Sequence, residues 1–170
     1  MTAAIQVAIL TISDRSAQGV RDDASGPVIR DALTSSSPPN SAPRFQIVAE
    51  DIVPDEPEMI SAKLIDYCDI LKADLVLTTG GTGFGPRDFT PEATLKVIER
   101  EVPGIPEAMR AEGLKKTPKA MLSRQRAGLR GKTLIVNLPG HPKAVREGLD
   151  VVLETIGHIL KVMHGVEAHR

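Results

Sequence analysis

The chain has 170 residues, of which 41% are hydrophobic, and this is enough to fill the core of one domain of ordinary size. The 21 basic and 22 acidic residues give a formal net charge of -1, so the chain as a whole has no electrostatic preference for nucleic acid or an anionic membrane. Three Phe, one Tyr and no Trp leave little material for stacking on bases. We therefore expect a single domain over residues 1–170 that binds neither nucleic acid nor membranes.

The first apolar run and the single cysteine indicate a protein of the cytoplasm. The run from Ile5 to Ile12 has no basic leader and is much shorter than a membrane span, so it predicts neither a signal peptide nor a transmembrane helix. Cys68 has no second cysteine in the chain with which to form a disulfide. We expect it to be a small buried thiol, which is a more common role than that of a nucleophile.

Four apolar runs rich in β-branched residues are short enough to be strands, and they span residues 6–13, 45–53, 74–79 and 133–138. Helical patterns alternate with these runs, and the four main patterns begin at Pro27, Pro57, Pro91 and Pro142. Proline is favourable there because its missing N–H would be unpaired in the first turn anyway. The alternation predicts an α/β fold, a three-layer open and mostly parallel sheet with helices on both faces.

Two stretches interrupt this alternation. Residues 34–44 are polar and rich in Ser and Pro, and because they join a helix to a strand we expect a mobile internal loop there. Residues 103–130 contain a short helical pattern at 105–114 and a break near Pro118. Residues 125–129 then have the pattern of a strand that pairs with residues 133–138 around a turn at Gly131.

The most informative motif runs from Thr78 to Asp88 and reads Thr-Thr-Gly-Gly-Thr-Gly-Phe-Gly-Pro-Arg-Asp. Glycines let a backbone bend sharply and approach a ligand, and exposed N–H groups cradle anions. A phosphate site is therefore favoured over a plain turn, although the motif is neither a Walker loop nor a dinucleotide fingerprint. The candidate phosphate contacts are Thr79, Gly80, Gly81, Thr82, Gly83 and Arg87.

Polar turns also follow the other three strands, at the edge where open α/β sheets bind ligands. Their candidate residues are Ser13 and Asp14, Asp55 and Glu56, and Pro139, Gly140 and His141. Taken singly, each is better explained as an ordinary turn, because turns collect these residue types. Together with the glycine loop, these three turns nevertheless predict a shared pocket at one edge, in which His141 either contacts substrate or caps a helix.

Asp55 and Asp88 are the candidate catalytic and metal-binding residues. Phosphoryl and nucleotidyl transfer are catalysed mainly by positioning and charge neutralisation, and two carboxylates are sufficient to hold a Mg²⁺ ion that bridges phosphate oxygens. Arg87, Lys143 and Arg15 are candidate sources of further positive charge. For Arg15 and Lys143 a solvated surface position explains the residue equally well.

Six segments resemble molybdopterin adenylyltransferases, the molybdenum-cofactor biosynthesis proteins related to the G domain of gephyrin. These segments are residues 7–14, 25–27, 53–56, 78–94, 121–124 and 134–144. The sequence Gly-Gly-Thr-Gly alone is shared with distant relatives of the family. Its continuation into Pro-Arg-Asp-x-Thr-Pro-Glu-Ala-Thr is specific to this group, so the resemblance extends over almost the whole chain.

The resemblance implies a cytoplasmic enzyme, commonly a homotrimer, that uses Mg-ATP to adenylate the terminal phosphate of molybdopterin and releases pyrophosphate. It implies a later hand-over to a molybdenum-inserting protein. Asp88 matches the family's catalytic aspartate, Asp55 its second important carboxylate, and residues 80–83 the phosphate-holding loop. The turns at 13–14 and 139–140 match those that line the pocket. His141 departs from the Ser, Asn or Gln of relatives, and the loop at 34–44 is longer than expected.

Two other functions remain open. A non-catalytic relative of the same fold would bind molybdopterin, or act as a scaffold for a partner, without adenylating anything. The presence of both Asp55 and Asp88 counts against this alternative. A molybdenum-inserting or competence-damage-inducible relative would be expected to depart from the continuation at residues 86–94, and this chain retains it.

Overall fold

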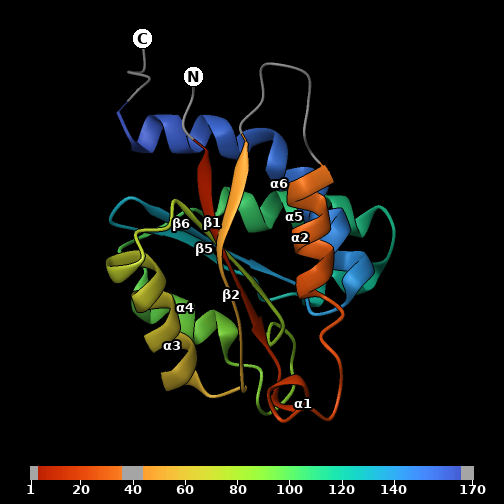
Figure 1. The fold of residues 1–170 in the computed structure, drawn as a ribbon. Helices are drawn as coiled ribbons and strands as arrows, with labels where there is room; N and C mark the ends of the chain where they lie inside the picture. The colour runs from red at the N-terminus through yellow and green to blue at the C-terminus, as the bar shows by residue number, and fades with distance from the viewer. Residues whose placement is uncertain (1–3, 36–43, 166–170) are drawn as a thin grey trace.

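The computed structural model describes residues 4–35 and 44–165, and its centre is a six-stranded sheet with the strand order β2-β1-β3-β6-β5-β4 (Figure 1). The strands are β1 (Ile5–Ile12), β2 (Phe45–Val53), β3 (Leu75–Thr79), β4 (Arg100–Glu101), β5 (Ala127–Arg130) and β6 (Thr133–Leu138). Strands β2, β1, β3 and β6 are parallel, whereas β5 and β4 extend one edge in antiparallel register. The predicted mostly parallel sheet is confirmed.

The helices, in chain order, are α1 (Asp14–Ala17), α2 (Gly26–Ser35), α3 (Pro57–Ile65), the π-helix η1 (Asp66–Ile70), α4 (Thr90–Val97), α5 (Gly104–Leu114), the 3-10 helix η2 (Pro118–Leu122) and α6 (Pro142–Met163). A proline occupies the first or second position of α3, α4 and α6. The prolines that mark helix starts in the sequence therefore do so in the structure.

Two helical layers cover the sheet (Figure 1). Val7 and Ile9 of β1 pack in the core under α2, α5 and α6, while Ala8 and Leu10 face the core under α3 and α4. This alternation follows from the two-residue period of a strand. Strands β3 and β6 are buried along their whole length because helices cover both faces, which explains the consecutive apolar residues at 75–77 and 134–136.

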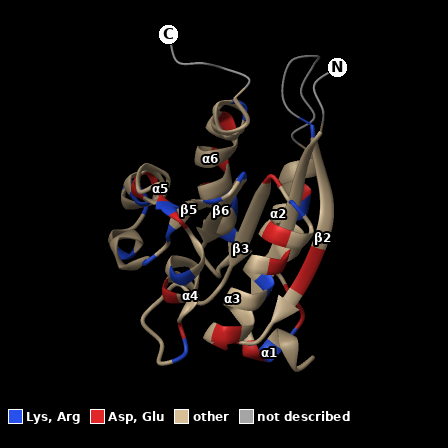
Figure 2. Cartoon of the chain, turned by 90° about the vertical axis from the view of Figure 1, so that its left-hand side faces the viewer, with Lys and Arg blue, Asp and Glu red and all other residues tan. Residues whose placement is uncertain are grey.

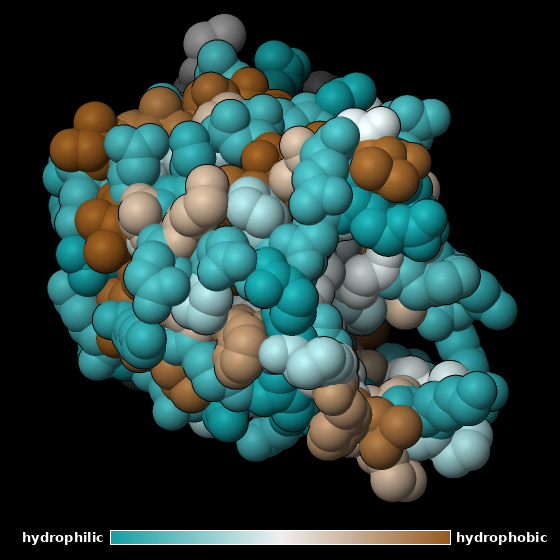
Figure 3. Space-filling view, turned by 90° about the horizontal axis from the view of Figure 1, so that it is seen from below, coloured by the Kyte–Doolittle hydropathy of each residue, from teal (hydrophilic) through white to brown (hydrophobic). Residues whose placement is uncertain are grey.

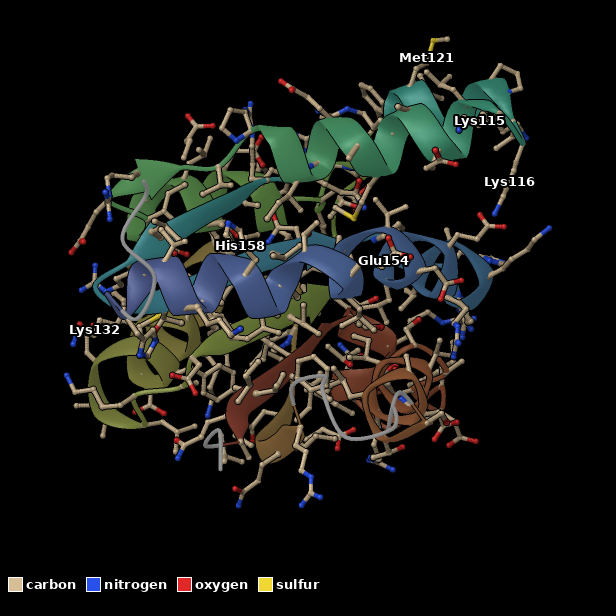
Figure 4. All side chains as sticks on the ribbon, turned by 90° about the horizontal axis from the view of Figure 1, so that it is seen from above. Lys115, Lys116, Met121, Lys132, Glu154 and His158 are labelled. Carbon is tan, nitrogen blue, oxygen red and sulfur yellow. The ribbon has the colours of Figure 1, made fainter. Side chains whose placement is uncertain are left out.

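Helices α5 and α6 lie side by side, with Lys115, Lys116 and Met121 beyond one end of α5 and His158 and Glu154 along α6 (Figure 4). Helix α6 has 22 residues, but its buried side chains share one face, against the sheet. Among the described residues, no helix combines the length and the apolar sequence that crossing a membrane requires.

The boundaries of several elements differ from those that the sequence predicts. Strand β1 ends at Ile12, and Ser13 caps helix α1, whose four residues have no periodic pattern of their own. Strand β5 begins two residues later than predicted, but it pairs with β6 around Gly131 as expected. The loop predicted at 34–44 lies mostly outside the described residues, and Thr34 and Ser35 belong to α2.

Candidate active site

The four parallel strands end at the same edge of the sheet, which is the lower end of the molecule in Figure 1. Viewed from this end, the surface is hollowed (Figure 3). A pocket of about 160 Å³ opens here between the turns that follow β1, β3 and β6 and the segment before α2. Its lining includes the predicted residues Ser13, Thr79, Gly80 and Gly140 and also Thr11, Ser16, Arg21, Asp22, Asp23 and Ser25.

The backbone of the glycine loop requires residues without a Cβ. Gly80 and Gly81 have φ angles of +97° and +65°, in the left-handed region. A Cβ at Gly80 would lie 2.2 Å from the carbonyl oxygen of Ile12, and one at Gly81 would lie 3.2 Å from Oδ1 of Asp55. Thr90 secures the bend, since its hydroxyl donates to the carbonyl of Gly80 over 2.8 Å. The loop backbone thereby lies directly against the end of β1 and against Asp55.

Asp14 and Asp55 hold each other through reciprocal hydrogen bonds. The backbone N–H of Asp14 donates to Oδ2 of Asp55 over 2.8 Å, and the N–H of Asp55 donates to Oδ1 of Asp14 over 3.0 Å. Arg87 donates to both carboxylate oxygens of Asp14, over 2.5 and 3.0 Å, and to Glu56 over 2.6 Å. The turns after β1 and β2 are thus joined to the far end of the glycine loop.

Negative charge accumulates around Asp55. The hydrogen bonds from Arg87 lower the pKa of Asp14 and raise the pKa of the guanidinium. Burial raises the pKa of Asp55, and the charges of Asp14 and Asp88 raise it further. Acidic side chains gather near α1 and the start of α3 (Figure 2). A cation would reverse the effect on Asp55, because it would favour the ionised carboxylate.

Asp88 turns its carboxylate back over the glycine loop. Its Oδ2 accepts a hydrogen bond of 2.7 Å from the N–H of Gly85, and a Cβ at Gly83 or Gly85 would lie 2.9 Å from that oxygen. Within the described residues, Oδ1 of Asp88 and Oδ1 of Asp55 accept no hydrogen bond from the protein. Each of the two aspartates therefore keeps one oxygen available to a ligand.

These two free oxygens fit a hard cation such as Mg²⁺, which takes one or two carboxylates and completes its shell with water and substrate oxygens. In the described part of the chain, no three or more His, Cys, Asp or Glu side chains are grouped so that they would hold a metal by themselves. A metal at Asp55 and Asp88 would consequently need further oxygens from water or a bound ligand.

The turn after β6 is fixed by hydroxyl groups from two other segments. Thr79 donates to the carbonyl of Pro139 over 2.6 Å, and Ser25 donates to that of Gly140 over 2.7 Å. A Cβ at Gly140 would lie 3.4 Å from Cα of Gly80, so this turn and the glycine loop are in close contact. His141 is the N-cap residue of α6, but its exposed side chain makes no capping hydrogen bond and does not line the pocket.

Asp23 and Arg124 belong to this site, although sequence reasoning gives neither a role. Asp23 accepts hydrogen bonds from the N–H groups of Ser25 and Gly26, over 2.9 and 3.0 Å, and one of 2.7 Å from the hydroxyl of Thr11. An Asp shortly before a helix start is a recognisable capping signal. Arg124 contacts the glycine loop from a distant segment and has no comparable local signal. By contrast, the candidate cations Arg15 and Lys143 are exposed and do not line the pocket.

Known proteins resemble this chain over most of its length. A family model described as "Probable molybdopterin binding domain" matches residues 8–158. The molybdopterin adenylyltransferase of Helicobacter pylori J99 is 44% identical over 161 residues, which are 95% of this chain and 89% of that protein. The gephyrin of Dictyostelium discoideum is 44% identical over 162 residues, which are 93% of this chain and 22% of that protein. The crystal structure of the molybdopterin biosynthesis enzyme MoaB from Thermus thermophilus has 48% sequence identity and a TM-score of 0.86, and the match covers 95% of this chain and 97% of that one.

Proposed function

Because the chain belongs to the family of molybdopterin-binding domains, we propose that it adenylates molybdopterin with ATP in the biosynthesis of the molybdenum cofactor. Curated relatives with this activity in their names, at 40 to 44% identity, support the proposal. The observation that carries it in the structure is the pair Asp55 and Asp88, each placed against the glycine loop with one oxygen unused. Neither aspartate lines the pocket itself, but Asp55 lies against Gly81, the residue after the pocket residue Gly80, so the proposal places the phosphates along this loop.

In the proposed reaction an oxygen of the terminal phosphate of molybdopterin attacks the α-phosphorus of ATP. The bond between that phosphorus and the bridging oxygen breaks, and pyrophosphate leaves with the electron pair. The protein contributes mainly position and charge to such a transfer. We assign the phosphate contacts to the backbone at 80–83, and the pocket contacts to Ser13, Thr79 and Gly140, which line it.

Asp55 and Asp88 would hold Mg²⁺, which when bound supplies positive charge at the phosphates. Without a cation, the negative charge at these residues repels a phosphate. The raised pKa of Asp55, caused first by burial and then by the charges of Asp14 and Asp88, shows that ionising this group is unfavourable in the protein alone. Arg87 is engaged by Asp14 and Glu56, so its first role in the proposal is to hold Asp14, and through it Asp55, in place. Homotrimer formation, location in the cytoplasm and hand-over to a molybdenum-inserting protein are further parts of the proposal and rest on the resemblance.

The test is direct. Purified protein mixed with Mg²⁺, ATP and molybdopterin should release pyrophosphate and form adenylated molybdopterin, measured by a pyrophosphate assay and by chromatography. Asp88→Ala should lower turnover about 1,000-fold or more while circular dichroism remains unchanged. Asp69→Ala is the control, because Asp69 pairs with Arg130 away from the pocket.

Two outcomes would contradict this proposal in different ways. Full activity of Asp88→Ala would remove the role assigned to that carboxylate. Calorimetric binding of molybdopterin with neither Mg-ATP binding nor product would favour the non-catalytic binding protein instead. Sedimentation of the same preparation tests the trimer independently of activity.

A further inference from the structure

Arg124 makes hydrogen bonds to the glycine loop, although it lies 36 positions after Asp88 in the sequence. It follows η2, and its side chain is 30% exposed. Its Nε donates to the carbonyl of Gly83 over 2.8 Å, and its Nη2 donates to the carbonyl of Asp88 over 2.6 Å. Its Nη1 pairs with the carboxylate of Glu92 in the first turn of α4. One side chain therefore binds the middle of the loop, its end and the helix that follows.

The main chain and the aromatic neighbour add to this attachment. The backbone N–H of Arg124 donates to the carbonyl of Thr82 over 3.0 Å. The guanidinium carbon lies 6.0 Å from the centre of the Phe84 ring, within the range of a cation–π contact. Phe84 is 70% exposed, so Arg124 is a protein contact for a side chain that otherwise faces solvent. The segment around Arg124 thus contacts the loop at Thr82, Gly83, Phe84 and Asp88.

A loop with glycines at 83 and 85 has many accessible conformations, and holding it in one conformation has a cost in entropy. The carboxylate of Asp88 depends on that one conformation, because it accepts its hydrogen bond from Gly85 of the same loop. We infer that Arg124 is a positioning residue that fixes the glycine loop, and with it Asp88, in the geometry required for phosphate transfer. The inference rests on the proposed function for its catalytic consequence and deepens it.

Arginine suits this role better than lysine does. Its planar guanidinium presents five donors in a fixed fork, so it can bind two carbonyls and a carboxylate at once. A lysine would keep the positive charge beside Glu92 but could not reproduce the two carbonyl contacts together. Arg124 contacts the backbone of Asp88 and not its carboxylate, so its action on the reaction is indirect.

The chain supplies a matched control. Arg130, the last residue of β5, joins two helices: it pairs with Asp69 of η1 and donates to the carbonyl of Val97, the last residue of α4, over 3.0 Å, and its side chain is 25% exposed. It lies at the opposite end of the sheet. Arg124→Lys and Arg130→Lys therefore remove comparable hydrogen bonds at comparable exposure, one beside the pocket and one away from it.

We expect Arg124→Lys to lower kcat about 10- to 100-fold with a smaller rise in the KM for ATP, because Thr90 still holds Gly80 whereas Asp88 is displaced. Arg130→Lys should lose a similar amount of thermal stability and keep its kcat. Partial recovery of Arg124→Ala by added guanidinium at low millimolar concentration would be a further sign, since lost stability would not recover in this way. Equal kcat values in the two lysine variants would overturn the inference.

A second measurement needs no substrate. In Arg124→Lys, hydrogen exchange of the amides of Gly85 and Asp88 should become about tenfold faster or more than in the unmodified protein, while the same amides in Arg130→Lys should not change. Unchanged exchange would contradict the positioning role. Faster exchange in a protein that never forms adenylated molybdopterin would support the positioning of the loop and refute only the proposed function.

Discussion

The two ends of the sheet differ in how an aspartate is paired and in the direction in which its pKa is shifted. At the end where the parallel strands begin, Asp69 accepts two hydrogen bonds from Arg130, over 3.0 and 2.7 Å, and the pairing lowers its pKa. At the other end the carboxylate of Asp55 accepts one hydrogen bond from the described part of the chain, that of the Asp14 N–H, and burial raises its pKa. The first arrangement stabilises the protein as it stands. The second has a cost that a bound cation would remove, as is common at functional sites, and this agrees with the function proposed for this end.

The glycines at the two ends differ in what would surround an added Cβ. Gly131, in the turn between β5 and β6, has a φ of +55° and open space where a Cβ would be. Gly80 also has a positive φ, but the place of its Cβ is filled by the backbone of Ile12. At one end glycine serves only the turn, whereas at the other it also allows two backbone segments to touch.

The largest expected effect comes from alanine at these two glycines. Gly80→Ala combines strained φ with a clash against rigid backbone, so we expect a loss of about 3–5 kcal/mol in the free energy of unfolding, or no soluble protein. Gly131→Ala should cost only about 1 kcal/mol, because only the φ strain remains. Urea unfolding of both variants measures the difference. Similar losses would show that the close approach at Gly80 does not matter.

Asp55→Asn should separate function from stability. The amide oxygen can still accept from the N–H of Asp14, so the turn should survive, while the rate of adenylation should fall about 100-fold or more. Near pH 7 the variant should be more stable than the unmodified protein, by at most about 1 kcal/mol because solvent screens a partly exposed charge. Steady-state kinetics and thermal unfolding measure the two effects.

The pH dependence of this effect has a definite sign. Folding raises the pKa of Asp55, so the free energy of unfolding of the unmodified protein is lowered at any pH where this group is ionised in the folded state. This loss of stability disappears as the pH falls through the folded pKa toward the unfolded value of about 3.9. The stability gain of Asp55→Asn should therefore shrink on acidification. Asp69→Asn is the opposite control. Because the pKa of Asp69 is lowered in the folded protein, the variant should be less stable than the unmodified protein near neutral pH, and this difference should shrink as the pH falls through the folded pKa. A gain in both variants would contradict the comparison of the two ends.

The smallest effect is expected for Arg87→Gln. Removing this cation exposes a substrate phosphate to Asp14 and Glu56, so the KM for ATP should rise about tenfold with a smaller change in kcat. Arg30→Gln is matched to it, since Arg30 pairs with Glu50 and its side chain is 50% exposed against 51% for Arg87. Initial rates at varied ATP test the pair. An equal rise in KM for both would assign the effect to net charge.

A linked stability measurement checks the local cause. Arg87 lowers the pKa of Asp14, so the stability that this pair contributes is present above the unfolded pKa of an Asp and is lost as the pH falls through the folded pKa. The difference in melting temperature between Arg87→Gln and the unmodified protein should accordingly close on acidification. A difference independent of pH would mean that the contact with Asp14 is not its source.

Much of the fold could be predicted from the sequence because its signals are local. β-branched runs mark the four parallel strands, and Pro57, Pro91 and Pro142 mark helix starts, since each property acts within a few residues. Strand β4 has only two residues and α1 only four, which is too short for a periodic pattern. The π-helix η1 continues α3 without a break in helical pattern, so its different hydrogen bonding has no signal in the sequence.

In the candidate site, too, some residues have a local signal in the sequence and others do not. The glycine loop, the polar turns after the strands and the two aspartates could all be predicted from the chain, because parallel strands end at one edge and the turns that follow them meet there. The contacts of Arg87 with Asp14 and Glu56, of Ser25 and Asp23 with the pocket wall, and of Arg124 with the glycine loop become visible only in the folded protein. Such contacts join side chains that are distant in sequence, and their partners are fixed only when the helices and strands pack against one another.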